Sequence, residues 1–144
     1  MAVMIRQAKA GDGGRVGKML DTFRREMGID VSVAVPLPVS HDGPLFAMIA
    51  EEDDEICGLL TAQRCVNLVR GVHFMLITDI FVDQAHRRQG VALGLINETV
   101  ALARRIGCVS VSLIVAESDE AVLKTAARAG FAAHEKNLLR LVLS

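Results

Sequence analysis

A short basic segment, Asp83–Ala92, carries the residue types best suited to binding an anion. It lies between an apolar run and a run with helical spacing, so Gly90 is expected to open a helix. A helix start presents unpaired backbone N–H groups and the positive end of the helix dipole, which suit a pyrophosphate. Gly90 lets the backbone approach the anion, and Ala92 keeps the first turn narrow. Arg87 and Arg88 add positive charge at the entrance. Taken alone, the segment is equally compatible with an ordinary strand–helix connection.

Two other phosphate-binding motifs are excluded. No Gly-Lys-Ser/Thr follows the glycine, so the segment is not a P-loop. The glycine-rich stretch Gly11–Val16 is not a dinucleotide fingerprint either, because Val16 stands where the third glycine is needed.

The elements that must position this segment follow from hydrophobic periodicity. His73–Val82 is almost wholly apolar and predicts a central strand covered on both faces. Spacing of three and four from Ala92 predicts a helix that stops at Gly107. The remaining predicted elements are strands over Val3–Ala8, Leu45–Ala50, Ile56–Gln63, Val109–Val115, Phe131–Lys136 and Leu138–Leu143, and helices over Asp12–Met27 and Asp119–Ala129. Hairpins followed by a strand–helix–strand crossover predict an α/β fold with a mixed sheet and helices on both faces.

Composition limits the class of protein. The 144 residues are 51% apolar and 23% charged, which predicts a packed single domain over residues 1–144. The net charge of −1 argues against a main role in binding nucleic acid or anionic membranes. No apolar run is long enough to span a membrane and no signal peptide is recognisable, so a cytoplasmic protein is expected. The three cysteines and four histidines are scattered, so no metal site is predicted.

Two sequence motifs together resemble a known family. The strand Ile77–Asp83 followed by Arg87–Ala92 is similar to motif A of the GCN5-related N-acetyltransferases (GNAT), a strand followed by Arg/Gln-x-x-Gly-x-Gly/Ala. The later strand, helix and closing Gly130-Phe131 are similar to the family's second signature. The resemblance implies a mostly antiparallel sheet in which two parallel strands, ending at Val82 and Val115, splay apart around acetyl-CoA.

The resemblance also implies roles for particular residues. The pantetheine arm of acetyl-CoA would pair with backbone groups of Ile80, Phe81 and Val82. The pyrophosphate would lie on Arg87, Arg88, Gln89, Gly90, Val91, Ala92 and Leu93, and Asp119 matches a pantetheine-contacting asparagine. A primary amine would then attack the thioester directly, while the chain holds both reactants, removes a proton and stabilises the oxyanion.

The general acid and base are less well defined. Many family members carry a tyrosine before Gly-Phe that protonates the leaving thiolate, but this chain has no tyrosine and has Ala126 there. Ser118 or water is the substitute for this general acid. The simpler role of Asp119 is to cap the helix that follows it. Asp79, in an apolar strand, either hydrogen-bonds locally or acts as the base with a raised pKa. Other candidate bases are Glu117, Glu26, Asp30 and His41.

Several alternatives remain open. The acceptor could be an amine-bearing small molecule or a protein amine, and the proline-bearing segment Asp30–Leu45 is expected to line the acceptor side. A homodimer is also compatible with the sequence. The missing tyrosine is also compatible with a regulatory module that binds CoA but does not catalyse acetyl transfer. A helix-turn-helix protein is the third alternative, and it requires a recognition helix over about Ala133–Val142.

Overall fold

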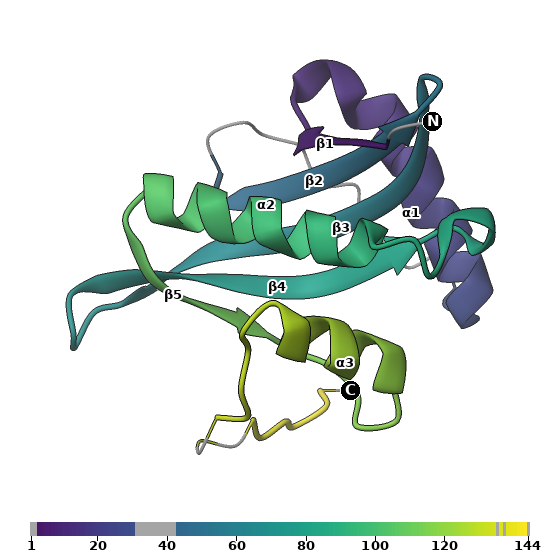
Figure 1. Ribbon diagram of the computed structural model, residues 1–144. Helices are drawn as coiled ribbons and strands as arrows, with labels where there is room; N and C mark the ends of the chain where they lie inside the picture. Colours follow the sequence, from purple (N-terminus) through teal and green to yellow (C-terminus); the bar gives the residue numbers. More distant parts are fainter. Residues whose placement is uncertain (1–2, 31–42, 135, 137, 144) are drawn as a thin grey trace.

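Five strands form one mixed sheet in the order β1-β2-β3-β4-β5. The computed structural model describes residues 3–30, 43–134, 136 and 138–143. The strands are β1 (Met4–Gln7), β2 (Leu45–Glu52), β3 (Glu55–Asn67), β4 (Val72–Val82) and β5 (Cys108–Leu113). Each of the pairs β1–β2, β2–β3 and β3–β4 is antiparallel, whereas β5 is parallel to β4 (Figure 1). The predicted mixed, mostly antiparallel sheet is therefore confirmed.

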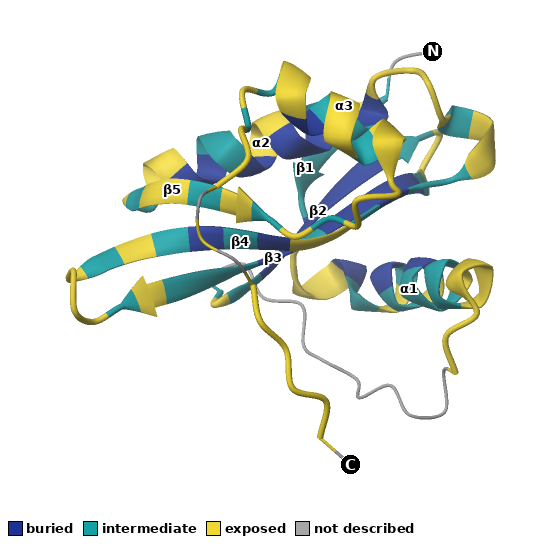
Figure 2. Cartoon of the chain, turned by 90° about the horizontal axis from the view of Figure 1, so that it is seen from below, coloured by how far each residue is buried: buried dark blue, intermediate teal, exposed yellow. Residues whose placement is uncertain are grey.

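Helices cover both faces of this sheet, as predicted. They are α1 (Gly13–Met27), α2 (Val91–Arg105) and α3 (Glu120–Arg128). Figure 2 shows α1 on one face and α2 with α3 on the other. Two hydrophobic clusters result, because the strands between them are apolar on both faces. The α1 cluster contains Val16, Met19, Ile49, Leu59 and Phe81, and the α2 cluster contains Leu60, Met75, Ile77, Leu95 and Ile96.

The position of α2 depends on a close approach to the first strand. A Cβ at Gly94 would lie 2.3 Å from the Ile5 Cδ1 atom, so no larger residue fits without a shift. Leu95 and Ile96, the next residues, are fully buried against the sheet. Glycine at this point therefore lets α2 lie flat across the strands, and it fixes where the amino end of α2 is held.

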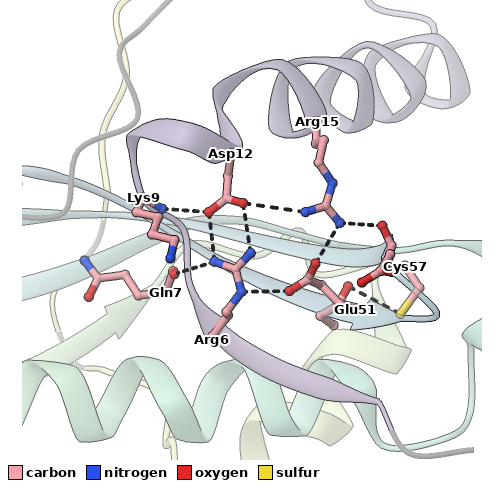
Figure 3. A network of polar contacts seen from close by, with 9 residues as sticks. Arg6, Gln7, Lys9, Asp12, Arg15, Glu51 and Cys57 are labelled. Carbon is pink, nitrogen blue, oxygen red and sulfur yellow. Dashed lines mark hydrogen bonds and ion pairs between the residues drawn. The ribbon is translucent and has the colours of Figure 1, made fainter.

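A buried carboxylate ties α1 to the sheet (Figure 3). Asp12 is 4% exposed and accepts two hydrogen bonds from Arg6, both 2.8 Å. Arg6 and Arg15 also bind Glu51 of β2, at 2.7 and 2.6 Å. The hydrogen bond from Arg6 holds the pKa of Asp12 well below its usual range, and that from Arg15 lowers the pKa of Glu51. The network thus joins β1, β2 and the start of α1, and Asp12 is charged at neutral pH.

The predicted C-terminal strand pair is wrong for the described residues. None of the residues described between Phe131 and Leu143 belongs to a strand or to a helix, so neither the strands Phe131–Lys136 and Leu138–Leu143 nor a recognition helix forms there. Phe131 packs against the α2 cluster and lines an open hollow of about 340 Å³ beside β5. Beyond it, Leu138, Leu139, Leu141, Val142 and Leu143 are exposed. Apolar, β-prone residues supply propensity, but a strand also needs a hydrogen-bonded partner.

Changing Asp12 to Asn should destabilise the fold. Arg6 and Arg15 would lose their buried counter-charge, and because both are partly exposed we expect a loss of about 2 kcal/mol in the free energy of unfolding. Urea denaturation at pH 7 measures it. The pKa of Asp12 is lower in the folded state, so its contribution is present above about pH 4 and is lost as the pH falls. The difference in the free energy of unfolding between the wild-type protein and the Asp12→Asn variant should therefore become smaller at acidic pH.

Asp21→Asn is the matched control. Asp21 lies on the same helix and, among the described residues, pairs only with Arg24 at the surface, at 3.1 Å. Its replacement should cost no more than about 0.5 kcal/mol. Equal losses in the two variants would show that the buried network does not stabilise the fold.

Candidate active site

The parallel strands β4 and β5 part halfway along β4. Their pairing runs from His73 and Cys108 to Ile77 and Leu113, and a last hydrogen bond of 3.3 Å runs from the Ile114 N–H to the Ile77 carbonyl. Beyond that point, residues 79–82 pair only with β3 within the part of the chain that the structure describes. The predicted splay is therefore present, although β5 ends at Leu113 rather than at Val115.

A β-bulge lies where the strands part. Asp79 pairs with Thr61 and Ile77 pairs with Ala62, so the register skips Thr78. Bulges re-aim side chains and are common beside active sites. Here the bulge changes the direction of β4 immediately after its last bond to β5.

Backbone groups at the end of β4 are left facing the open side. The Asp83 N–H donates to the Cys57 carbonyl of β3 at 2.8 Å. Because successive residues of a strand point their backbone groups in opposite directions, those of Val82 and Ile80 face away from β3. The backbone groups of Ile80 and the N–H of Val82 thus lie on an edge with no strand partner in the described chain, whereas the Val82 carbonyl accepts a hydrogen bond of 2.9 Å from the Arg87 Nε. Phe81, between them, directs its backbone to β3 and its side chain to the α1 cluster.

The loop that follows opens directly into α2. Gly90 is the N-cap residue with φ +79°, and no side chain caps the helix. The first intrahelical bond runs from the Gly94 N–H to the Gly90 carbonyl at 3.0 Å. The N–H groups of Val91, Ala92 and Leu93 consequently have no partner within the helix. Free N–H groups at a helix start suit an anion, and these belong to the segment for which the sequence predicted a pyrophosphate.

Gly90 is required mainly for its backbone conformation. A Cβ there would meet no heavy atom within 4 Å, so the space beside it is open. Its φ, however, lies in the left-handed region that side chains disfavour. Arg88, two residues earlier, also has a positive φ of 64° and is exposed. The turn formed by Arg88 and Gly90 therefore leaves open space at the start of α2, with the basic side chain of Arg88 close by in the chain.

The basic and polar side chains of the loop do not all point to this open space. Arg87 instead extends towards α1, where its Nε donates to the Val82 carbonyl at 2.9 Å and its Nη2 donates to Glu26. Its guanidinium lies 5.9 Å from the centre of the Phe81 ring. Gln89 donates to the Ala85 carbonyl of its own loop at 3.2 Å.

A histidine anchors the other side of the loop. The His86 ring contacts Asp83 and lies 3.4 Å from Glu52 of β2. The hydrogen bond to Asp83, with a smaller contribution from Glu52, raises the pKa of His86. The loop of residues 83–90, named the phosphate loop after the pyrophosphate that the sequence predicts there, is thus held to the β2–β3 hairpin by His86 and to α1 by Arg87.

Asp79 lies at the bulge with an exposed side chain. It is two residues before Phe81, so alternation along the strand places it on the α1 face of the sheet. Partial burial raises the pKa of the Asp79 carboxyl, while the hydroxyls of Thr61 and Thr78 oppose that rise. These two hydroxyls are 2.8 Å apart. An exposed carboxyl with a raised pKa, at the end of the strand pairing, can accept a proton from a bound amine.

The turn before α3 has a mainly structural geometry. The Asp119 side chain accepts a hydrogen bond of 3.2 Å from the Val122 N–H and so caps the helix, as its simpler role predicted. Ser118 and Glu117 are exposed in the same turn. Ala126 is buried, at the position where many family members have tyrosine. Of the other candidate bases, Asp30 is exposed beyond the end of α1 and His41 lies outside the described residues.

Sequence reasoning missed two features of this site. The contact between Arg87 and Glu26 joins residues 61 positions apart, and no local pattern signals it. The Thr61–Thr78 hydroxyl pair depends on the bulge, for which the only signal was Thr78-Asp79 within an apolar strand. Among the described residues, no three potential metal ligands lie together and no helix is long and apolar enough to cross a membrane.

Comparison with known proteins agrees with this geometry. A model of the acetyltransferase (GNAT) family matches residues 18–131. No curated protein sequence matches the chain. One similar solved structure is an aminoglycoside acetyltransferase from an uncultured soil metagenomic sample, in complex with sisomicin; it is 18% identical, with 99% of this chain and 96% of that chain covered and a TM-score of 0.84.

Two further structures have the same fold. A second aminoglycoside acetyltransferase from an uncultured soil metagenomic sample is 20% identical over 100% of both chains, with a TM-score of 0.86. The ribosomal-protein-alanine N-acetyltransferase of Brucella melitensis biovar Abortus 2308 is 19% identical, over 99% of this chain and 100% of that chain, with a TM-score of 0.79. With the family model covering most of its length, the chain belongs to the GNAT family of acetyltransferases.

Proposed function

We propose that this protein transfers an acetyl group from acetyl-CoA to an amine. The observation that carries the proposal is the juxtaposition of two unsatisfied sets of backbone groups. The open edge of β4 at Ile80 and Val82 leads through one short loop to the uncapped N–H groups of α2. An extended amide-bearing arm that ends in a pyrophosphate can use both sets together.

The residues present fit acetyl-CoA as the acyl donor. The open space at Gly90 and the free N–H groups of Val91, Ala92 and Leu93 suit a pyrophosphate, and the exposed Arg88 adds positive charge. Ile80 offers a backbone donor and acceptor to the pantetheine amides, and Val82 offers its N–H, while the Val82 carbonyl is held by Arg87. When bound, acetyl-CoA supplies an activated thioester. The contribution of the chain is to hold that arm in one geometry, which can lower the barrier by several kcal/mol.

Asp79 is the proposed base. It lies on the α1 face, where the acceptor amine would approach from the side opposite α2, and its exposed carboxyl can take a proton directly or through water. No tyrosine exists to protonate the leaving thiolate, so the exposed Ser118 or water is proposed for that role. Small-molecule amines and protein amines are both candidate acceptors, since similar structures include aminoglycoside and ribosomal-protein acetyltransferases.

One observation favours a second candidate, a CoA-binding module without turnover. Ala126 fills the position of the family tyrosine, and this buried side chain carries no hydroxyl to protonate a leaving thiolate. Transfer assays with an amine panel separate the two functions. Acetyl transfer to any amine supports the enzyme, whereas binding of acetyl-CoA with no transfer at any pH supports the module.

Gly90→Asp should abolish binding of acetyl-CoA. The side chain would enter the open space at the start of α2 and place a negative charge where the pyrophosphate is proposed. At a ligand concentration of 100 times Kd, the native protein should gain about 2.7 kcal/mol of stability, and the variant should gain none. A thermal-shift titration with acetyl-CoA measures both.

Gly107→Asp is the matched control, because Gly107 has φ +85° and a Cβ there would also meet open space, at the opposite end of α2. It carries the same strain and charge but should keep the ligand-induced shift. An unchanged shift in Gly90→Asp would mean that the donor binds elsewhere.

Asp79→Asn should lower turnover and flatten the rising limb of the pH–rate profile, while acetyl-CoA affinity stays nearly unchanged. Losing a general base typically costs about 10²–10⁴-fold in rate. Because the pKa of this carboxyl is raised in the folded protein, ionised Asp79 does not stabilise the fold, and the variant should not melt earlier at pH 7. Glu117→Gln should leave the profile intact. If Glu117→Gln flattens it instead, the base has been misassigned.

A further inference from the structure

One side chain crosses from the phosphate loop to the opposite face of the sheet. Arg87 is the first residue after the 3-10 turn Gln84–His86, on the chain that leads into α2. Yet its Nε binds the carbonyl of Val82, the last residue of β4, and its Nη2 binds Glu26 in the last turn of α1. Its guanidinium also lies over the Phe81 ring. Arg87 therefore links three elements at the point where β4 ends.

The same region of α1 is held by an aromatic pair. Phe23 stacks on Phe81 with ring centroids 4.6 Å apart and an interplanar angle of 28°. Phe23 and Glu26 lie one turn apart on α1. The same helix therefore contacts the end of β4 twice, through the ring stack on Phe81 and through the ion pair with Arg87. The last part of α1, which borders the proposed acceptor side, is thus attached to the residues that begin the proposed donor site.

We propose that Glu26 is a positioning residue for the donor site. By holding Arg87 against the Val82 carbonyl, it fixes the end of β4 and the start of the phosphate loop relative to α1. This inference rests on the proposed function, because it concerns how the acetyl-CoA site is kept in shape. It also gives Arg87 a role different from the phosphate contact that its place in the sequence motif implies.

The contact between Glu26 and Arg87 matters to the donor site through geometry rather than through charge. One donor molecule must engage the β4 edge and the α2 N–H groups together, so the angle between these two surfaces decides whether both contacts form. Small displacements of a positioned ligand are costly to the reaction. Arg87 suits the task because its planar fork can bind the Val82 carbonyl and the Glu26 carboxylate at once, which an ammonium group cannot reproduce.

The exposure of the pair limits the size of the effect. The side chains of Arg87 and Glu26 are 42% and 45% exposed. For Glu26→Gln, which keeps an acceptor but loses the charge, we expect KM for acetyl-CoA to rise about threefold with kcat little changed. For Glu26→Ala and Arg87→Lys we expect a rise of about five- to tenfold. Asp21→Asn, which removes an acid paired with Arg24 of α1, should leave KM unchanged.

A double-substitution cycle separates positioning from catalysis. If Glu26 acts through Arg87, then Glu26→Ala combined with Arg87→Ala should raise KM no more than Arg87→Ala alone. If Glu26 were the general base, Glu26→Gln would lower kcat, flatten the rising limb of the pH–rate profile and add to the effect of Arg87→Ala. A lower melting temperature with an unchanged KM would show a merely structural contact. Either of these results overturns the proposal.

A measurement without any ligand tests the same contact. Amide hydrogen exchange of residues 83–90 in the free protein should speed up in Glu26→Ala and Arg87→Ala but not in Asp21→Asn. If the wild-type protein neither binds CoA nor transfers acetyl groups, the proposed function fails. If the wild-type protein binds acetyl-CoA normally and loop exchange is the same in all variants, only the role of Glu26 fails.

Discussion

The site depends on the fact that, among the residues that the structure describes, β4 has a strand partner on both sides only as far as Ile77. A strand buried in the middle of a sheet normally satisfies every backbone group within the sheet. Here β5 ends early and the bulge at Thr78 lies at the same point, so the backbone groups of Ile80 and the N–H of Val82 have no strand partner on that side in the described chain, although both residues are half-buried. The cost of leaving such groups unpaired makes this edge a place where a ligand with amide groups can bind.

The rest of the molecule holds this edge from both faces. On one face, the close approach at Gly94 and the burial of Leu95 pack α2 tightly against the sheet. This packing fixes the position of the free N–H groups at the start of α2. On the other face, the Arg6–Asp12 network fixes the beginning of α1, and Phe23 packs its far end against Phe81. The opposite ends of α1 are thus tied to different strands. Rigid attachment of this kind is what a site needs if it works mainly by positioning.

Much of this architecture could be predicted from the sequence because its signals are local. Gly28 ends α1 in a left-handed conformation, Asp53 and Asp54 form the hairpin turn, and Gly90 opens α2, each where the residue type predicts it. The direction of the Arg87 side chain could not be predicted, because its partner Glu26 comes from a distant element. The C-terminal strands were predicted wrongly for a related reason: Leu138–Leu143 has strand-forming residues, but pairing depends on what lies beside it in three dimensions.

The free edge of β5 has a consequence for how the protein behaves in concentrated solution. The outer side of β5 has no strand partner in the described chain. Val109 of this strand is 65% exposed, and an open hollow lies beside the strand. The aliphatic side chains of the C-terminal segment are exposed as well. Unpaired edges and exposed apolar side chains are the features through which folded proteins associate non-specifically. With a net charge of only −1, long-range repulsion between molecules is weak, so colloidal stability should fall as the concentration rises.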